Sequence, residues 1–330
     1  MNEIAVFGSG AWGTALAATW ARNGNSVALW AFPEEAGHEM QRTKRHPRLP
    51  GGELPQSLRV VTNPVDAFGA DVWVSATPTQ VTPGLWAKFL KDRAERPKCL
   101  IHVSKGILQS THGRLSAALE PIVGVPVGVL SGPTFATEVY AQLPAAIVLA
   151  LPDAVPDGEC QRLQEMLASP RLRVYLSRDV VGVELCGALK NVLAIAAGVL
   201  ESLNLGLNAR AALLTRGLAE MSRLVDRMGG RPETVMGLAG MGDLLLTATG
   251  SQSRNRTFGE LLGRGQSPAG AANSMGEQVV EGVYSAVAAM AMATELGVEL
   301  PITHEVLRLL EGRDPKIAVD ALMGRGLKAE

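Results

Sequence analysis

The sequence has few aromatic residues and almost no net charge. Aromatic side chains make up 4% of its 330 residues, whereas hydrophobic residues make up 47% and charged residues 19%. These fractions are typical of a folded globular protein that packs through aliphatic side chains. The formal net charge of −1 argues against the strongly basic surface that nucleic-acid binding requires. A local site for an anion needs only a few charges and stays open.

Cysteine is also scarce, and no metal-ligand spacing occurs. There are three cysteines, an odd number, and they lie far apart in the sequence: Cys99, Cys160 and Cys186. This predicts a reducing compartment and no disulfide framework. The five histidines do not have the spacing of zinc ligands, so we predict no metal site.

Long apolar runs are absent. Runs such as residues 192–200 are shorter than the roughly 18 residues that a membrane helix needs. The residues before Ile4 do not resemble a secretory signal. We therefore expect no membrane span and a cytoplasmic location.

The chain divides by pattern into two halves, as its length also suggests. The first half alternates β-rich runs with helical stretches, which predicts a mostly parallel sheet covered by helices. The expected strands are residues 4–7, 26–30, 58–61, 72–76, 99–103, 127–131, 146–150 and 172–176. Residues 179–330 are rich in helix formers and are expected to form an all-helical domain. Within it, the Gly/Ala-rich residues 269–272 are expected to form a loop.

A glycine pattern follows the first expected strand. The strand runs into Gly8, Gly10 and Gly13, and a helix is expected from about Trp12 to about Asn23. In a dinucleotide fold the first glycine permits the tight turn, the second lets the backbone approach a pyrophosphate, and the third lets the helix lie close to the strand. The alternative is a plain tight turn. The context favours a doubly wound Rossmann domain, over residues 1–178, that binds NAD(H) or NADP(H).

The second expected strand lacks the acidic residue that often holds the cofactor ribose. It continues into Ala31, Phe32 and Pro33, and the carboxylates of Glu34 and Glu35 come later. No arginine for a 2′-phosphate is evident at this point. The preference between NADH and NADPH is therefore open.

Six further segments occur in a characteristic order. They are SKGI at 104–107, SGPTFA at 131–136, GALKN at 187–191, GLAGMGDL at 237–244, SRNR at 253–256 and EQVVEG at 277–282. With the glycine pattern, they resemble the soluble, bacterial-type NAD(P)-dependent glycerol-3-phosphate dehydrogenases over nearly the whole chain. This resemblance implies the reversible reduction of dihydroxyacetone phosphate to sn-glycerol 3-phosphate for phospholipid synthesis.

The resemblance assigns Lys190 as the catalytic residue. Ketone reduction needs an acid that protonates the oxygen, and desolvation lowers the pKa of a lysine toward a useful range. Lys190 lies among small, uncharged neighbours, although an exposed helix face is the commoner place for a lysine.

The resemblance also implies the contacts of the substrate and the cofactor. Substrate contacts are expected at Lys105, Gly132, Thr134, Lys190, Asn191, Asp243, Ser253, Arg254 and Asn255. Cofactor contacts are expected at Gly8, Gly10, Ala11, Trp12, Gly13, Phe32, Lys105, Ala136, Arg254, Val279 and Glu281. Several of these residues have simpler structural alternatives: a solvated lysine at 105, a strand-to-helix turn at 132–134, a helix N-cap at 243 and a polar loop at 253–255.

Two other functions share the glycine pattern. A different Rossmann dehydrogenase, of the 3-hydroxyacid or sugar-nucleotide type, has no need for the Ser-Arg-Asn group at 253–255. A non-catalytic NAD(P)-sensing module has no need for Lys190. The resemblance to the glycerol-3-phosphate dehydrogenases also implies that the protein forms a homodimer.

Overall fold

A single sheet organises the first half of the chain. The computed structural model describes residues 3–276 and 278–326. The strands are β1 (Glu3–Phe7), β2 (Ser26–Trp30), β3 (Leu58–Val61), β4 (Val72–Ser75), β5 (Cys99–His102), β6 (Val127–Ser131), β7 (Ala145–Ala150) and β8 (Leu172–Ser177). Each expected strand is confirmed, with ends that differ by at most one residue from the prediction.

The order of the strands places the first strand inside the sheet. The order is β3-β2-β1-β4-β5-β6-β7-β8, and neighbouring strands are parallel except β6 and β7. The predicted mostly parallel sheet is confirmed. Since parallel strands end at the same edge, the residues after β1, β2, β4, β5 and β6 gather there, where open α/β sheets bind ligands.

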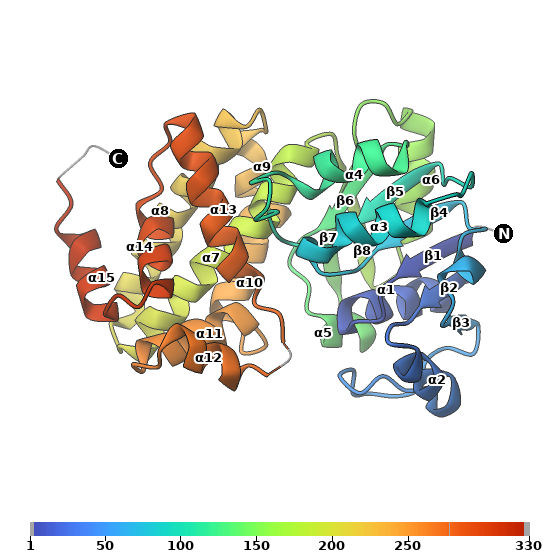
Figure 1. The fold of residues 1–330 in the computed structure, drawn as a ribbon, viewed down its shortest axis with the longest axis horizontal. Coiled ribbons are helices and arrows are strands. Elements are labelled where there is room, and N and C mark those ends of the chain that lie inside the picture. The colour runs from blue at the N-terminus through green and yellow to red at the C-terminus, as the bar shows by residue number, and fades with distance from the viewer. Residues whose placement is uncertain (1–2, 277, 327–330) are drawn as a thin grey trace. The chain divides into compact units, whose positions relative to one another are not determined.

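Helices follow the strands and then fill the second half (Figure 1). The helices of the first half are α1 (Ala11–Arg22), α2 (Glu34–Thr43), α3 (Thr82–Leu90), α4 (Leu115–Val123), α5 (Ala136–Tyr140) and α6 (Asp157–Leu167), with 3-10 turns η1 (Pro64–Ala67) and η2 (Thr79–Val81). The later helices are α7 (Val180–Ser202), α8 (Gly206–Arg227), α9 (Pro232–Met236), α10 (Asp243–Thr249), α11 (Arg254–Gly263), α12 (Pro268–Ser274), α13 (Glu281–Leu296), α14 (Pro301–Leu310) and α15 (Pro315–Met323), with a π-helical turn η3 (Leu238–Gly242).

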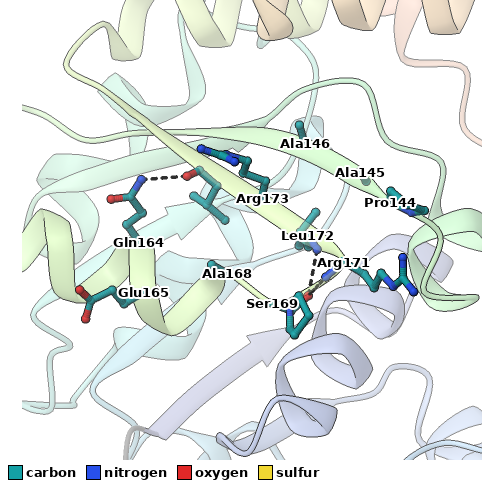
Figure 2. A pocket seen from close by; sticks show the side chains of 12 residues that line it. Pro144, Ala145, Ala146, Gln164, Glu165, Ala168, Ser169, Arg171, Leu172 and Arg173 are labelled. Carbon is teal, nitrogen blue, oxygen red and sulfur yellow. Dashed lines mark hydrogen bonds between the residues drawn. The ribbon is translucent and has the colours of Figure 1, made fainter.

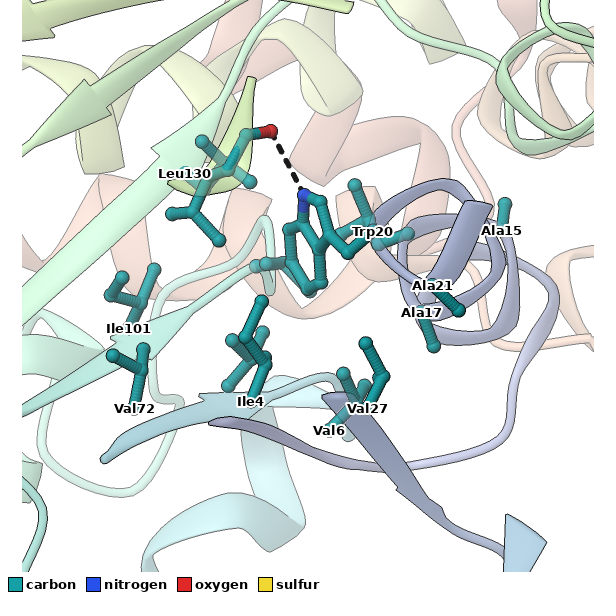
Figure 3. Close-up of a cluster of buried hydrophobic side chains, with 14 of the residues drawn as sticks. Ile4, Val6, Ala15, Ala17, Trp20, Ala21, Val27, Val72, Ile101 and Leu130 are labelled. Atoms are coloured by element: carbon teal, nitrogen blue, oxygen red, sulfur yellow. Dashed lines mark hydrogen bonds between the residues drawn. The ribbon is translucent and has the colours of Figure 1, made fainter. Parts of the chain in front are cut away.

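One face of the sheet packs against α1 and α6 through an aliphatic core. Ile4 and Val6 of β1 are buried in this core together with Trp20 of α1. Figure 3 shows the Trp20 indole among these side chains, and its N–H donates to the Leu167 carbonyl at 2.9 Å. The hydrogen bond satisfies the polar end of a fully buried side chain and ties α1 to α6.

The other face of the sheet holds many of the chain's few aromatic residues. Phe7, which follows Val6 on β1, lies 4.9 Å from the Trp86 ring of α3. The rings of Trp73 and Trp86 stack at 5.6 Å, and Phe68 contacts Trp73 at 4.9 Å. Both faces of β1 are therefore buried from Ile4 to Phe7, which explains why these four residues are all apolar rather than alternating.

The helical half packs by close approach of backbones. A Cβ atom on Gly198 of α7 would lie 2.0 Å from the Arg256 carbonyl oxygen, and one on Gly259 of α11 would lie 2.0 Å from the Ile195 carbonyl oxygen. Only glycine allows α7 and α11 to come this close. Helix α7 is long and apolar enough to cross a membrane, but 89% of its most apolar window is buried by the rest of the chain, as in the central helix of a globular domain.

Two local features of the helices were predicted: the end of α1 and a loop in the helical half. The first prediction is confirmed and the second is wrong. Helix α1 ends where expected, and Gly24 has a φ of +87° that suits the left-handed stop. The loop expected at 269–272 is wrong, because these residues lie inside α12. Pro268 occupies the first turn of that helix, and the Ser267 hydroxyl accepts a hydrogen bond from the Gly270 amide at 3.1 Å. This proline and cap outweigh the low helix propensity of the single glycine.

The described residues form two compact units. Of the described residues, one unit comprises 3–104 and 115–183, and the other comprises 105–114, 184–276 and 278–326. The sequence pattern predicts a boundary at 178/179 and gives no sign that a segment from within the first half belongs to the helical unit. That segment is held by ion pairs, including Arg114 with Glu184 at 2.7 Å.

Candidate active site

The glycine turn after β1 is shaped by two steric requirements. Gly8 has a φ of +123°, and a Cβ atom there would lie 2.6 Å from the Ala76 carbonyl oxygen. A Cβ atom on Gly13 would lie 2.2 Å from the Gly8 carbonyl oxygen. The turn and the close contact between α1 and β1 therefore require glycine at both positions.

Gly10 has no such structural requirement. It is the N-cap of α1 with a φ of −63°, and no atom lies within 4 Å of a Cβ built there. A side chain at Gly10 would instead fill the space in front of the first turn of α1, where Ala11 and Trp12 begin the helix. The first amides of a helix have no intrahelical acceptor and bind anions. The turn therefore fits the pyrophosphate of a dinucleotide.

The residues after β2 offer an exposed aromatic ring. The Phe32 side chain is 72% exposed, and its ring lies 5.9 Å from that of Trp30. A ring in this position can stack on a base but cannot hydrogen-bond a ribose. The cofactor contact of Phe32 stays a prediction.

The segment after β6 contains three further predicted contacts. Gly132 has a φ of +155°, and a Cβ atom there would lie 3.1 Å from Ile147 Cα. The Thr134 hydroxyl donates to the Gly132 carbonyl at 3.2 Å, and Ala136 begins α5. These residues therefore form the strand-to-helix turn that was the simpler alternative. Their contacts with ligands stay predictions.

Lys190 is buried in the helical unit. The residue is 6% exposed and belongs to α7, between Leu189 and Asn191, which are also buried. An exposed helix face, the commoner place for a lysine, is thereby excluded. A lysine at such a position needs specific partners.

Those partners are on α10 and on the segment after β5. The Lys190 ammonium lies 3.0 Å from Asp243 Oδ1 and donates to the Thr247 hydroxyl at 2.7 Å. Asp243 Oδ2 accepts a hydrogen bond from the Lys105 ammonium at 2.5 Å. We call Lys105, Lys190, Asp243 and Thr247 the lysine cluster. Lys105 is thus a paired, partly buried group rather than a solvated one.

The geometry of the lysine cluster also rules out the simpler interpretation of Asp243 as a helix N-cap. Asp243 is the first residue of α10 rather than its N-cap, and its carboxylate faces the lysines. Thr247 is a member of the cluster that the sequence motifs do not indicate. Its position four residues after Asp243, on the same face of α10, is the signal that could have found it.

Burial and charge together set the protonation of the cluster. The pKa of Lys190 is lowered to about 8: burial lowers it most, the neighbouring Asp243 raises it, and the positive charges of Lys105 and Arg254 lower it further. Burial alone would raise the pKa of Asp243, but the two lysines outweigh it and hold this pKa below its usual value. Lys190 can therefore exchange a proton near neutral pH beside a carboxylate that stays ionised.

Two buried amide side chains, those of Asn191 and Asn255, connect the elements around the cluster. Asn191 Nδ2 donates to the Lys105 carbonyl at 2.9 Å and to the Gly187 carbonyl at 3.3 Å. Asn255 Nδ2 donates to Asn191 Oδ1 at 2.8 Å, and Asn255 Oδ1 accepts from the Gly282 amide at 2.9 Å. These bonds connect α7, α11 and α13. The predicted contacts of both amides with substrate stay predictions.

The residues predicted to bind the substrate phosphate lie at the start of α11. Ser253 is the N-cap of this helix, and its hydroxyl accepts from the Arg256 amide at 3.2 Å. Arg254 is exposed, and its charge acts on Lys190. A helix N-terminus with an arginine at its first position favours a phosphate.

The last predicted cofactor contacts lie at the start of α13. Val279 is partly buried, and Glu281 is the first residue of the helix. Glu277, where that sequence segment begins, lies outside the described residues.

A separate pocket lies elsewhere in the unit that contains the sheet. It has a volume of about 730 Å³ and lies between α6, β7 and β8, with Gln164, Arg171 and Arg173 among its lining residues (Figure 2). Gln164 donates to the Val174 carbonyl at 2.8 Å. The predicted site residues are not part of its lining.

Both halves of the chain match family models. The model described as "NAD-dependent glycerol-3-phosphate dehydrogenase N-terminus" matches residues 3–155, and the one described as "NAD-dependent glycerol-3-phosphate dehydrogenase C-terminus" matches residues 179–320.

Individual proteins are similar over the whole chain. A glycerol-3-phosphate dehydrogenase (NAD(P)+) of Geobacter sulfurreducens is 46% identical over 337 residues, which cover 100% of this chain and 99% of that protein. One of Corynebacterium glutamicum is 41% identical over 337 residues and 100% of both chains. The crystal structure of glycerol-3-phosphate dehydrogenase from Coxiella burnetii has a TM-score of 0.91 and 40% identity, covering 98% of this chain and 99% of that one. These matches confirm the resemblance found in the sequence.

Proposed function

We propose that this chain, which belongs to the NAD-dependent glycerol-3-phosphate dehydrogenase family, reduces dihydroxyacetone phosphate reversibly to sn-glycerol 3-phosphate. The observation that carries the proposal is the lysine cluster, in which the buried Lys190 has a pKa of about 8 beside an ionised Asp243. Such a group suits proton transfer to the oxygen of a ketone as it is reduced.

Lys190 is the general acid. A protonated lysine has three N–H donors, and Thr247 and Asp243 engage two of them at 2.7 and 3.0 Å. The third donates to the substrate oxygen and transfers its proton when the carbon is reduced. Thr247 and Asp243 fix the ammonium, so that little reorganisation is needed during the reaction.

The cofactor is NAD(H) or NADP(H), and its nicotinamide supplies the hydride when it is bound. Gly8, Gly10 and Gly13 shape the turn, while the first amides of α1, from Ala11 and Trp12, hold the pyrophosphate. The further cofactor contacts that we propose from the resemblance are Phe32, Lys105, Ala136, Arg254, Val279 and Glu281.

The substrate is recognised through its phosphate. Arg254, at the start of α11, supplies a guanidinium that can bind phosphate by two parallel hydrogen bonds. Ser253 and Asn255 flank it, although both make structural hydrogen bonds as well. Lys105 adds positive charge, and Gly132, Thr134 and Asn191 complete the proposed substrate contacts.

The wider role follows from the family resemblance. We propose that the enzyme supplies sn-glycerol 3-phosphate for phospholipid synthesis in the cytoplasm and acts as a homodimer. Residues 1–178 would bind the cofactor, and residues 179–330 would carry the catalytic lysine. These statements stay predictions.

The proposal is tested by following the oxidation of NADH and NADPH with three substrates. Dihydroxyacetone phosphate should be reduced, unphosphorylated dihydroxyacetone should react far more slowly, and a 3-keto acid should not react. Efficient reduction of the keto acid alone would establish a different dehydrogenase. Cofactor binding with no turnover of any ketone would favour the non-catalytic sensing module.

A further inference from the structure

The segment between α2 and β3 is folded against the glycine turn. Its only strongly buried polar side chain among the described residues 44–54 is His46, which is 5% exposed. The segment is closed by a hydrogen bond from the Leu54 amide to the Lys44 carbonyl at 2.6 Å. The Tyr140 hydroxyl also donates to the Gly52 carbonyl at 3.2 Å. His46 is thus held in a well-defined loop.

The hydrogen bonds of His46 define its tautomer. The Arg48 amide donates to His46 Nδ1 at 3.1 Å, so Nδ1 is the acceptor nitrogen. Nε2 then carries the proton of the neutral ring and donates to the Ser9 carbonyl at 3.0 Å. Burial, together with the charge of Arg48, keeps the pKa of His46 below 6.5 despite the hydrogen bond to Ser9. The ring is therefore neutral at pH 7.

The Ser9 carbonyl has a second donor. The Thr14 hydroxyl of α1 donates to the same oxygen at 3.2 Å. In a planar trans peptide the C=O and N–H bonds point in opposite directions. Two donors on the Ser9 carbonyl therefore fix the direction of the Gly10 amide N–H, which lies at the N-cap of α1, beside the free amides of its first turn.

We propose that His46 is a positioning residue for the cofactor, which aims the Gly10 amide at the pyrophosphate by holding the Ser9 carbonyl. The inference rests on the proposed function for the identity of the ligand. His46 acts through the glycine turn, and its side chain does not itself take part in the chemistry.

The test is the dissociation constant for NADH, measured by fluorescence titration at pH 7.5. His46→Phe keeps an aromatic ring but removes the donor, and we expect two- to tenfold weaker binding, about the worth of one hydrogen bond. His46→Gln restores an N–H donor and should bind within about twofold of the wild type. With saturating NADH, kcat should be unchanged in both variants.

Two further variants separate this role from a general loss of structure. His38→Phe replaces an exposed histidine of α2 and should leave NADH binding and the melting temperature unchanged. Thr14→Val removes the second donor and should weaken binding in the same way as His46→Phe. Because both residues hold one carbonyl, their effects should be coupled in a double-mutant cycle.

The outcomes are distinct. Wild-type affinity in His46→Phe would overturn the inference and leave the proposed function intact. A stable His46→Gln that binds as weakly as His46→Phe would show that the hydrogen bond is not the cause. A wild-type enzyme that binds neither NADH nor NADPH would overturn the proposed function itself.

Discussion

The glycine turn and the lysine cluster differ in the chemical groups that they offer to a ligand. The turn, residues 8–13, contains no charged side chain and offers backbone amides to an anion. The lysine cluster places two lysines and one aspartate among buried helices. Backbone amides do not titrate, so the turn should bind its ligand with little dependence on pH. A buried lysine does titrate, so the cluster should make the chemical step depend on pH.

This contrast predicts separable effects. Changes in the glycine turn should alter cofactor affinity, and changes in the lysine cluster should alter the rate. A change in either region that affects both quantities equally would break the comparison.

The largest effect is expected from Lys190→Met. This variant removes the proton donor, and kcat should fall by about 10²–10⁴, the usual worth of general acid catalysis. The NADH dissociation constant should be unchanged, because Asp243 keeps its ion pair with Lys105. Stopped-flow turnover and NADH titration check both quantities, and the exposed Lys316→Met of α15 is the matched control. Near-normal turnover would remove Lys190 from the mechanism.

The next largest effect is expected from Arg254→Ala. The KM for dihydroxyacetone phosphate should rise about ten- to a hundredfold, since hydrogen bonds between charged groups contribute about 1.5–3 kcal/mol. The slow reaction of unphosphorylated dihydroxyacetone should change little. Arg264→Ala, at an exposed position beyond the same helix, should have neither effect. Equal losses with both substrates would assign Arg254 to the cofactor or to folding.

A smaller effect should come from Gly10→Ala. The structure has room for this methyl group, so the melting temperature should stay within a few degrees of the wild type, as for other mild surface changes. NADH affinity should fall about tenfold, because one charge-assisted hydrogen bond is displaced. Gly13→Ala is the contrasting variant, since its methyl group would overlap the Gly8 carbonyl and destabilise the fold. Unchanged NADH affinity in Gly10→Ala would place the pyrophosphate elsewhere.

The smallest effect concerns the choice of cofactor. The residues after β2 offer neither a carboxylate for the ribose nor an arginine for its 2′-phosphate, and Phe32 is exposed there. The ratio of kcat/KM for NADH and NADPH should therefore lie within about tenfold, or about 1.4 kcal/mol. The basic residues at 42–48 are the group that would shift it toward NADPH. A preference of a hundredfold would show that another residue reads the ribose.

The glycine turn could be predicted from the sequence because all its determinants are local. Gly8, Gly10 and Gly13 lie within six residues, at the junction of a strand and a helix whose apolar patterns are clear. The strands were predictable for the same reason, because the inner ones, such as β4, β5 and β6, are short apolar runs that the sheet buries on both faces, and β8 at the edge still begins with alternating buried and exposed residues.

The lysine cluster could be predicted only in part. The family resemblance supplied Lys105, Lys190 and Asp243, but their contacts depend on segments far apart in the chain. Thr247 was missed because a threonine in an apolar helix has an ordinary structural explanation, namely a bond from its hydroxyl to the carbonyl four residues earlier, which it also makes. Likewise, the membership of residues 105–114 in the helical unit follows from tertiary contacts and not from local pattern.

The central claim is that Lys190 is the proton donor and has a pKa near 8. The direct test is the pH dependence of kcat/KM in both directions, which reports the protonation of the free enzyme. Reduction of dihydroxyacetone phosphate needs the protonated lysine, so its rate should be level at low pH and fall above about pH 8. Oxidation of sn-glycerol 3-phosphate needs the neutral lysine, so its rate should rise through the same pH. In Asp243→Asn both limbs should move to lower pH, because the carboxylate raises the pKa of Lys190. Profiles that show no opposite limbs near pH 8, or limbs that persist in Lys190→Met, would contradict the account.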